Sequence, residues 1–219
     1  MRKVAVIYPL DSSPTTVTYV FAKKALGLLD KYKNKLIIDE FPVVNANRLS
    51  WIFSKAFNSG YDFVIYAGHG LKDKIIGQAY IFGLPIGLIW PMSDTSLAPK
   101  VKIFFAVACL TGRVLARDYV RKRTLAYVGN VDYTFIAYPK PEHNYMLDFI
   151  DTWITFVDYI LKGYTVSRAL MRFRERMLYY INLYDEYSER WDYAKFYMEL
   201  MKRNLNGFRL FGRGDVKLW

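Results

Sequence analysis

Two short apolar runs, about forty residues apart, most constrain what this chain can fold into. The first run, residues 63–68, leads into His69-Gly70, and the second, residues 103–108, leads into Cys109. Apolar runs of this kind are typical of strands that are buried on both faces of a parallel sheet. If the two strands are neighbours, their carboxyl ends place His69 and Cys109 at the same edge of that sheet.

The first half of the chain alternates between strand and helix patterns, which predicts an α/β fold with a mainly parallel sheet covered by helices on both faces. The expected strands cover residues 3–8, 36–41, 63–68, 102–108 and 124–128. The expected helices cover residues 16–30, 45–58 and 113–123. Gly and Pro residues punctuate residues 72–94 and predict a hairpin beside His69.

Beyond residue 141 the pattern changes to long helices, expected over residues 142–161, 165–180 and 185–203, and then to a final strand over residues 207–212. Neither an internal repeat nor a low-complexity linker marks a boundary. We therefore expect a single domain over residues 1–219, with the helical segment of about 142–205 packed on the sheet. This segment is so rich in aromatic residues that we expect some on the surface, where they offer a contact for a homo-oligomer.

The composition is that of an ordinary folded protein in a reducing environment. Of 219 residues, 53% are hydrophobic and 23% charged, and the single cysteine excludes an internal disulfide. The apolar stretch 147–161 carries Asp148, Asp151 and Asp158, so it is typical of an amphipathic helix rather than of a membrane span. The start of the chain reads as a strand and shows no signal-peptide pattern. We therefore expect a cytoplasmic protein without a membrane segment.

The charged residues bear on the partners and on the source of the protein. The formal net charge of +11 at pH 7 would attract acidic partners, although a charge of this size more often serves solubility. The abundance of Lys and Arg, with a single glutamine, is typical of a heat-adapted source.

Cys109 and His69 are the residues of this chain that point most directly to chemistry. Cys109 is the only cysteine and His69 is one of two histidines. An imidazole that ionises a nearby thiol is the simplest machinery of a cysteine hydrolase. A cysteine at the end of an apolar strand is often only a small buried side chain. Here, however, Gly70 and Gly112 let the backbone of a substrate approach closely, and the coincidence on two strand ends favours a catalytic pair.

These segments resemble the caspase-like cysteine peptidases, and within that group most closely the gingipain family and the CHAT domains. The resemblance lies in the His69-Gly70 step after one strand and the Ala108-Cys109 step after the next. It continues through residues 125–130, 156–170 and 210–215. The last of these is similar to the family's Leu-Phe-Gly-Asp-Pro but has an inserted Arg213-Gly214 and no proline, which alters the final loop. The resemblance covers most of residues 60–217 and implies the three-layer caspase/hemoglobinase fold.

The resemblance also implies a mechanism, namely peptide hydrolysis through a thioester acyl-enzyme with no metal and no organic cofactor. His69 would activate Cys109 or protonate the leaving amine. The backbone N–H groups of Gly70 and Cys109 would form the oxyanion hole.

Substrate preference rests on two candidate acids. In the resembled fold the loop after the first strand helps to form the pocket for the residue before the scissile bond, so Asp11 is one candidate for selecting a basic side chain. An aspartate before Ser-Ser-Pro is, however, more often a turn residue. Asp132, just past the fifth strand, is the rival candidate. Either acid predicts cleavage after Arg or Lys.

A different class of function competes with the peptidase, namely an inactive caspase-like module that binds a protein partner or nucleic acid. Its support is a basic helix in which Arg113, Arg117 and Arg121 are spaced by four and share one face. Such a stripe is also the ordinary solvated face of a helix.

Two other kinds of site fit the sequence poorly. A tyrosine-phosphatase loop needs an arginine six positions after the cysteine, where this chain has Leu115. One cysteine and two distant histidines do not form a zinc cluster, and we expect His143 to be a surface residue.

Overall fold

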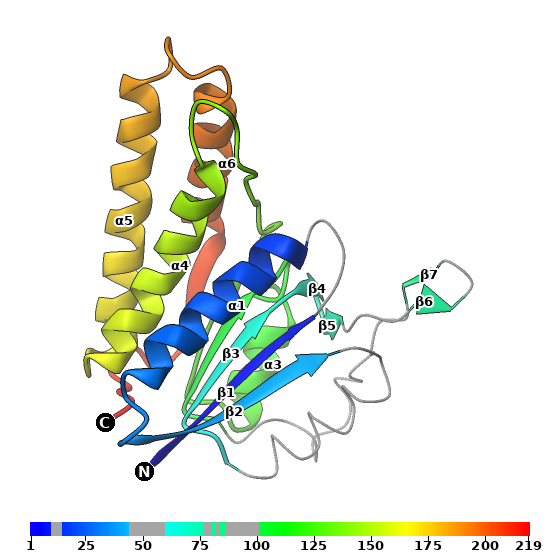
Figure 1. Ribbon diagram of the computed structural model, residues 1–219. Coiled ribbons are helices and arrows are strands. Elements are labelled where there is room, and N and C mark those ends of the chain that lie inside the picture. Colours follow the sequence, from blue (N-terminus) through cyan, green and yellow to red (C-terminus); the bar gives the residue numbers. More distant parts are fainter. Residues whose placement is uncertain (10–14, 44–59, 77–79, 82–83, 86–100) are drawn as a thin grey trace.

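A six-stranded sheet forms the centre of the protein in a computed structural model that describes residues 1–9, 15–43, 60–76, 80–81, 84–85 and 101–219 (Figure 1). The strand order is β10-β9-β8-β3-β1-β2, and every neighbouring pair is parallel except β10 with β9. The strands are β1 (Arg2–Pro9), β2 (Leu36–Val43), β3 (Phe63–Ala67), β8 (Ile103–Val107), β9 (Ala126–Asn130) and β10 (Phe208–Gly212). The predicted α/β class with a mainly parallel sheet is thus confirmed.

The two central strands are the apolar runs that precede His69 and Cys109. Every residue of β3 and of β8 is buried, as expected for strands covered on both faces. They pair in parallel with Ala67 opposite Val107, and the N–H of Gly68 donates to the carbonyl of Val107 at 3.0 Å. In this register the last residues of β3 and β8 lie opposite each other, so both strands end at the same edge of the sheet.

Helices cover both faces of the sheet and make three layers (Figure 1). On one face, α1 (Thr15–Asp30), α4 (Tyr145–Leu161), α5 (Val166–Glu186) and α6 (Ala194–Gly207) share one large core with alternate strand residues such as Val4 and Val6. On the other face, Ala5 and Ile7 belong to a smaller core with α3 (Leu115–Lys122). Because successive strand residues point to opposite faces, each strand serves both cores.

Several element boundaries differ from those predicted. Helix α5 continues to Glu186, because Ile181 and Tyr184 extend its buried face. Helix α6 begins only at Ala194, because Trp191 stacks on the rings of both His143 and Tyr187 and holds turns between the two helices. The predicted helix over residues 45–58 lies outside the described residues.

The segment after β3 forms hairpin pieces, as the Gly and Pro pattern predicted. Strand β4 (His69–Leu71) pairs with β5 (Lys74–Ile76), and β6 (Tyr80–Ile81) pairs with β7 (Leu84–Pro85). His69 is therefore the first residue of a hairpin strand.

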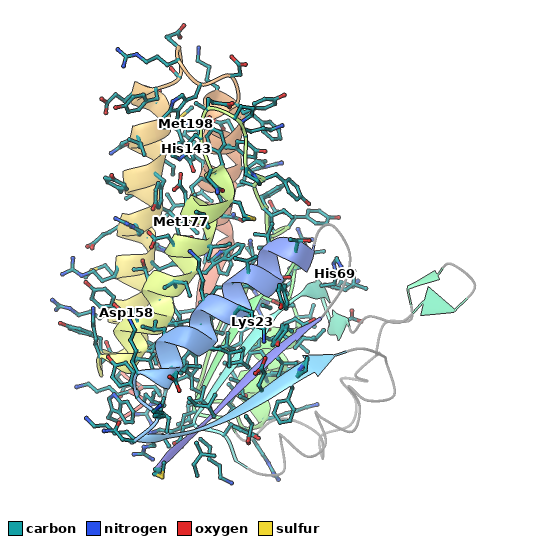
Figure 2. All side chains as sticks on the ribbon, in the orientation of Figure 1. Lys23, His69, His143, Asp158, Met177 and Met198 are labelled. Carbon is teal, nitrogen blue, oxygen red and sulfur yellow. The ribbon has the colours of Figure 1, made fainter. Side chains whose placement is uncertain are left out.

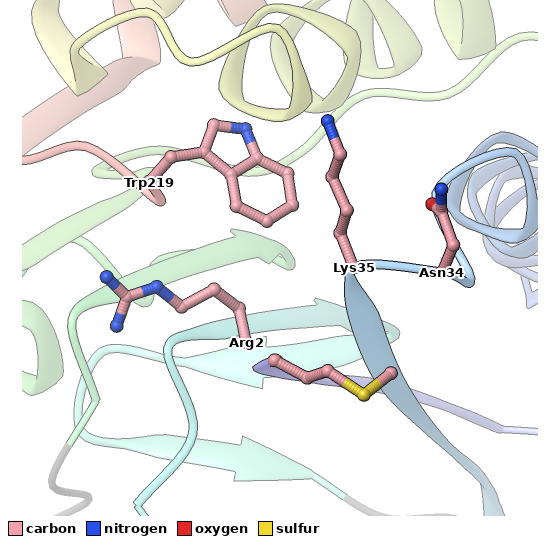
Figure 3. A pocket seen from close by; sticks show the side chains of 5 residues that line it. Arg2, Asn34, Lys35 and Trp219 are labelled. Atoms are coloured by element: carbon pink, nitrogen blue, oxygen red, sulfur yellow. The ribbon is translucent and has the colours of Figure 1, made fainter.

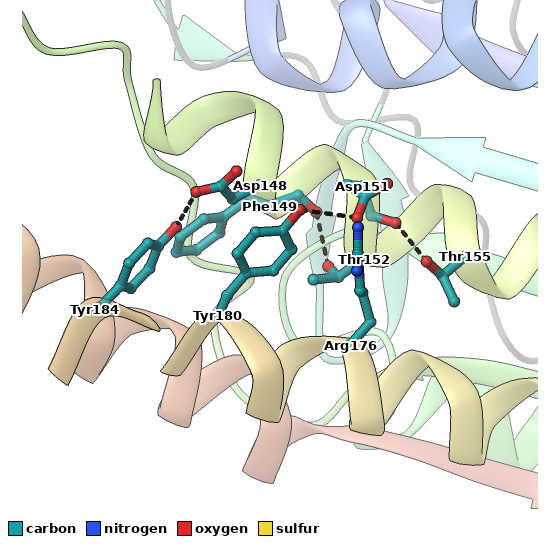
Figure 4. Close-up of polar contacts among 8 residues, drawn as sticks. All are labelled: Asp148, Phe149, Asp151, Thr152, Thr155, Arg176, Tyr180 and Tyr184. Atoms are coloured by element: carbon teal, nitrogen blue, oxygen red, sulfur yellow. Dashed lines mark hydrogen bonds and ion pairs between the residues drawn. The ribbon is translucent and has the colours of Figure 1, made fainter. Parts of the chain in front are cut away.

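Two of the three acidic residues of the apolar helix α4 have partners on α5 (Figure 4). Tyr184 donates its hydroxyl to Asp148 at 2.8 Å, and Tyr180 donates to Asp151 at 2.9 Å. Arg176 also pairs with Asp151. These contacts join two amphipathic helices, and no helix in the described part of the chain has the length and apolar character needed to cross a membrane.

Candidate active site

The loops that carry His69 and Cys109 lie directly against each other. A Cβ placed on Gly70 would fall 2.5 Å from the carbonyl oxygen of Cys109 and 2.5 Å from the Cγ2 of Thr111. Real side-chain atoms do not approach backbone oxygen so closely, so only glycine fits at position 70. The close neighbour of Gly70 is thus the Cys109 loop, and the approach of a substrate backbone to Gly70 stays a prediction. Gly112 likewise packs on the chain, since its N–H donates to the carbonyl of Asn130 at 2.8 Å.

Hydrogen bonds from Tyr66 and from the start of α3 also hold the His69 hairpin in place. The buried Tyr66 donates its hydroxyl to the carbonyl of His69 at 2.9 Å. At the tip of the hairpin, the carbonyl of Lys72 accepts from the N–H groups of Val114 and Leu115 at 3.0 and 2.9 Å. These two N–H groups open helix α3, so the hairpin satisfies donors that a helix start leaves unpaired. The half-buried His69 is therefore positioned by backbone contacts on both sides of it.

Cys109 begins a tight turn in which the next residue, Leu110, has an unusual backbone conformation. Leu110 has a φ of 60°, in the left-handed region that non-glycine residues rarely adopt. Such a conformation costs on the order of 1–3 kcal/mol and persists only where the surroundings hold it. Here the N–H of Leu110 donates to the carbonyl of Asp132 at 2.8 Å. The turn that presents Cys109 is thus held in place by the segment that follows β9.

The sulfur of Cys109 is half-buried and has one clear hydrogen-bond donor. Burial raises the pKa of the Cys109 thiol, and the carboxylate of Asp132 raises it further. The N–H of Thr134, whose nitrogen lies 3.4 Å from Sγ, opposes this effect and lowers the pKa. The net direction is upward, so Cys109 in this state is mainly a neutral thiol at neutral pH.

Residues 130–135 lie against the Cys109 turn and form another side of the site, and the sequence pattern identified only Asp132 among them. Asn130 and Asn204 are fully buried, and each forms hydrogen bonds to the backbone of this segment. Apart from Asp132, the sequence signal in this segment was an asparagine at a strand end, which is typical of a turn. Nothing near Asn204 in the sequence indicates a contact with Phe135, 69 residues earlier.

The two candidate specificity acids differ in what the structure describes. The half-buried Asp132 lies beside the Cys109 turn, because its carbonyl accepts from Leu110 and its N–H donates to Asn130 Oδ1 at 2.9 Å. Asp11 lies outside the described residues.

The predicted stripe of three arginines on one helix is wrong in part. Helix α3 begins at Leu115, so Arg113 precedes it and uses its Nε to donate to the carbonyl of Val131 at 2.6 Å. Arg117 and Arg121 are exposed on α3 itself. Because tight turns follow Cys109, the helix begins after Arg113, and this arginine does not share the helix face of Arg117 and Arg121.

The prediction that His143 is a surface residue is wrong. Its side chain is only 23% exposed, its Nε2 lies 2.5 Å from Asp148 Oδ2, and its ring stacks on Trp191 at 4.2 Å. Figure 2 shows His143 among the helices, away from His69. Within the described ranges no cluster of three or more His, Cys, Asp or Glu residues has the arrangement of a metal site.

Surface features elsewhere do not contribute to the paired loops. A hollow between Arg2, Asn34, Lys35 and Trp219 lies at the amino ends of β1 and β2, opposite the edge that carries Cys109 (Figure 3).

Of the aromatic residues in the C-terminal helices, Tyr184 and Tyr197 are buried, whereas Tyr179 and Phe196 are more than half exposed. The homo-oligomer contact through such residues stays a prediction.

Comparison with known proteins identifies the fold. No protein-family model matches the sequence, and no curated protein matches it significantly. Several solved structures do match. Among them, the Arg-specific cysteine proteinase gingipain R superposes with a TM-score of 0.60 over 98% of this chain, at 14% identity. The complex of the pro- and mature domains of RgpB from Porphyromonas gingivalis gives a TM-score of 0.54 over 99%, at 12% identity. The chain has the caspase-like fold that the sequence predicted.

The match extends over this whole chain but over only part of the matched structures. The chain spans 47% of the gingipain R chain and 48% of the RgpB chain. At 12–14% identity the likeness concerns the fold.

Proposed function

We propose that the protein is a cysteine peptidase in which Cys109 is the nucleophile and His69 is its acid–base partner. One observation carries this proposal: Gly70 packs on the carbonyl of Cys109, so a histidine and the only thiol of the chain flank one backbone contact. Both lie just beyond the carboxyl ends of paired parallel strands, where α/β proteins commonly hold catalytic groups.

The proposed reaction has two halves. His69 takes the thiol proton of Cys109, and the sulfur attacks the carbonyl carbon of the peptide bond. The tetrahedral intermediate collapses to a thioester as the imidazolium returns the proton to the leaving amine. Water, deprotonated by His69, then attacks the thioester and releases the carboxylic acid and the thiol.

Two properties of the site fit these steps. Because burial raises the pKa of Cys109, an external base is needed to produce the nucleophile at neutral pH. The N–H groups of Gly70 and Cys109 belong to the touching loops and are assigned to the oxyanion. One such donor typically contributes about 3 kcal/mol to stabilising the transition state.

A preference for Arg or Lys before the scissile bond is part of the proposal. Asp132 is tied to the Cys109 turn through the hydrogen bond from Leu110, so its carboxylate is close enough to the nucleophile to influence it electrostatically. A carboxylate at the rim of a site binds a guanidinium or ammonium group by a charge-assisted hydrogen bond. Gingipain R, which has this fold, is described as Arg-specific.

The test is labelling with a peptide chloromethyl ketone that ends in Arg or Lys, read by intact mass. We expect a single adduct on Cys109, its loss in Cys109→Ala and in His69→Ala, and its retention in His143→Gln, which changes the other histidine. An Asp-ending reagent should react much more slowly. If iodoacetamide reaches Cys109 but no peptide reagent does, the peptidase proposal is wrong.

The alternative function is an inactive module that binds an anionic partner through α3. The observation in its favour is that Arg117 and Arg121 are exposed on the helix that follows the Cys109 turn. Binding to a short DNA duplex should then weaken steeply as salt rises, and it should be lost in Arg117→Ala/Arg121→Ala but kept in Cys109→Ala.

A further inference from the structure

The segment after β9 faces the sulfur of Cys109 and supplies its hydrogen-bond donor. The nitrogen of Thr134 lies 3.4 Å from Sγ, and the carbonyl oxygen of Thr134 lies 4.0 Å from it. An N–H directed at sulfur favours the thiolate over the neutral thiol. The position of this one backbone group therefore influences how readily Cys109 ionises.

Asn204 fixes the residue next to Thr134. It is fully buried on α6, its Oδ1 accepts from the N–H of Phe135 at 2.9 Å, and its Nδ2 donates to the carbonyl of Phe135 at 2.8 Å. A carboxamide has both a donor and an acceptor, so it can pair with the N–H and the C=O of one residue as a neighbouring strand would. The two bonds hold the peptide units on both sides of Phe135, and the first of these units joins Phe135 to Thr134. They therefore limit how far Thr134 can turn.

Asn130 fixes the other side of Thr134. Its Nδ2 donates to the carbonyl of Tyr133 at 3.0 Å. It is itself packed against α6, because a Cβ on Gly207 would lie 1.9 Å from its Oδ1. The N–H of Val131 also donates to the carbonyl of Gly207 at 3.0 Å. The last turn of α6 and the segment 130–135 are therefore joined at several points around the sulfur.

We propose that Asn204 is a positioning residue, which holds the backbone of Phe135 so that the N–H of Thr134 stays directed at Cys109 and stabilises its thiolate. The inference rests on the proposed function for its biological role, since Cys109 is the nucleophile of the proposed peptidase. Asn204 acts through Thr134 and does not itself contact the sulfur in this account.

The test is the pH dependence of Cys109 alkylation by iodoacetamide in the full chain, followed by intact mass. Because Cys109 is the only cysteine, one mass shift reports one site. Loss of a hydrogen bond to an ionised group should raise the alkylation midpoint of Asn204→Ala by about one pH unit, and should slow alkylation at pH 7 about tenfold. A merely structural role for Asn204 would lower the melting temperature and leave this midpoint where it is.

Met201→Ala is the matched control. Met201 is fully buried on the same helix, one turn before Asn204, and belongs to the large core. This variant should lower the melting temperature without moving the alkylation midpoint. Should Asn204→Ala fail to fold, Asn204→Ser keeps a polar group that is too short for both bonds, and it should move the midpoint in the same direction.

Two results would overturn the proposal: an unchanged midpoint in a folded Asn204 variant, or an equal shift in Met201→Ala. The experiment needs no peptide substrate, so it is separate from the test of the peptidase. A protein that cleaves nothing can still show the shift, and an active peptidase without the shift would contradict only the role of Asn204.

Discussion

Replacing Gly70 by alanine tests whether the His69 and Cys109 loops are packed as tightly as the structure indicates. The added Cβ would lie 2.5 Å from the carbonyl oxygen of Cys109, 2.5 Å from Thr111 Cγ2 and 3.1 Å from Ala108 Cβ. The nearest of these is backbone, which cannot rotate away. One loop must therefore move away from the other.

The expected cost follows from measured effects of overpacking. Inserting a methyl group into a well-packed site typically costs about 1–3 kcal/mol. For a chain of this size, that corresponds to a fall in the melting temperature of about 2–12 °C. If the protein is a peptidase, a displacement on the order of 1 Å between His69 and Cys109 should also lower the rate about a hundredfold.

The same substitution at Gly27 provides the control, because it has the opposite expected sign. Gly27 lies within α1, and a Cβ placed there meets nothing within 4 Å. Alanine is more favourable than glycine inside a helix by about 1 kcal/mol, so Gly27→Ala should raise the melting temperature. Thermal unfolding by circular dichroism measures both variants. A Gly70→Ala protein as stable as Gly27→Ala, with unchanged alkylation of Cys109, would refute the packing argument.

Three further predictions concern the thiol and the helical segment. Burial raises the pKa of Cys109, so iodoacetamide alkylation should have its midpoint above the value of about 8.5 for a free thiol. The stability contributed by the neutral thiol is then fully present below that pH and lost as pH rises through the raised value; a midpoint below 8 would contradict this account. Tyr184→Phe should destabilise the protein more than Tyr180→Phe in urea unfolding, by about 1 kcal/mol, because its partner Asp148 is 12% exposed and Asp151 is 37% exposed. Thr165→Ala removes the side chain that caps α5 through the N–H of Arg168, and it should cost about 1 kcal/mol, or about 2–4 °C in melting temperature.

The central sheet was predictable because its signal is local. The runs before His69 and Cys109 are apolar throughout, and a strand buried on both faces requires this of nearly every residue. Strand β10 followed from a short pattern in the same way. Placing the two central strands side by side needed only the preference of successive α/β units for adjacent positions.

Apart from Asp132, the contribution of residues 130–135 to the site was not predictable, because it depends on contacts between distant residues. Asn204 and Phe135 are 69 residues apart. An asparagine near a helix end more typically caps the helix than forms buried hydrogen bonds to a distant backbone segment. The same reason explains the error at His143. Its burial depends on Trp191 from the turn between α5 and α6 and on Asp148 from α4, and neither contact has a signature in the residues around His143.

Two opposing effects on Cys109 decide what the site needs in order to react. Burial disfavours the thiolate, the N–H of Thr134 favours it, and burial is the larger of the two. The positioning of Thr134 by Asn204 therefore reduces the cost of ionising the sulfur but does not cancel it. In addition to this hydrogen bond, a positively charged group must stabilise the thiolate at neutral pH. In the proposed mechanism that charge is the imidazolium of His69, formed by the same proton transfer that ionises Cys109. If the proposed mechanism holds, the helical segment and the His69 hairpin each help Cys109 to ionise, and a change in either one should alter the reactivity of the thiol.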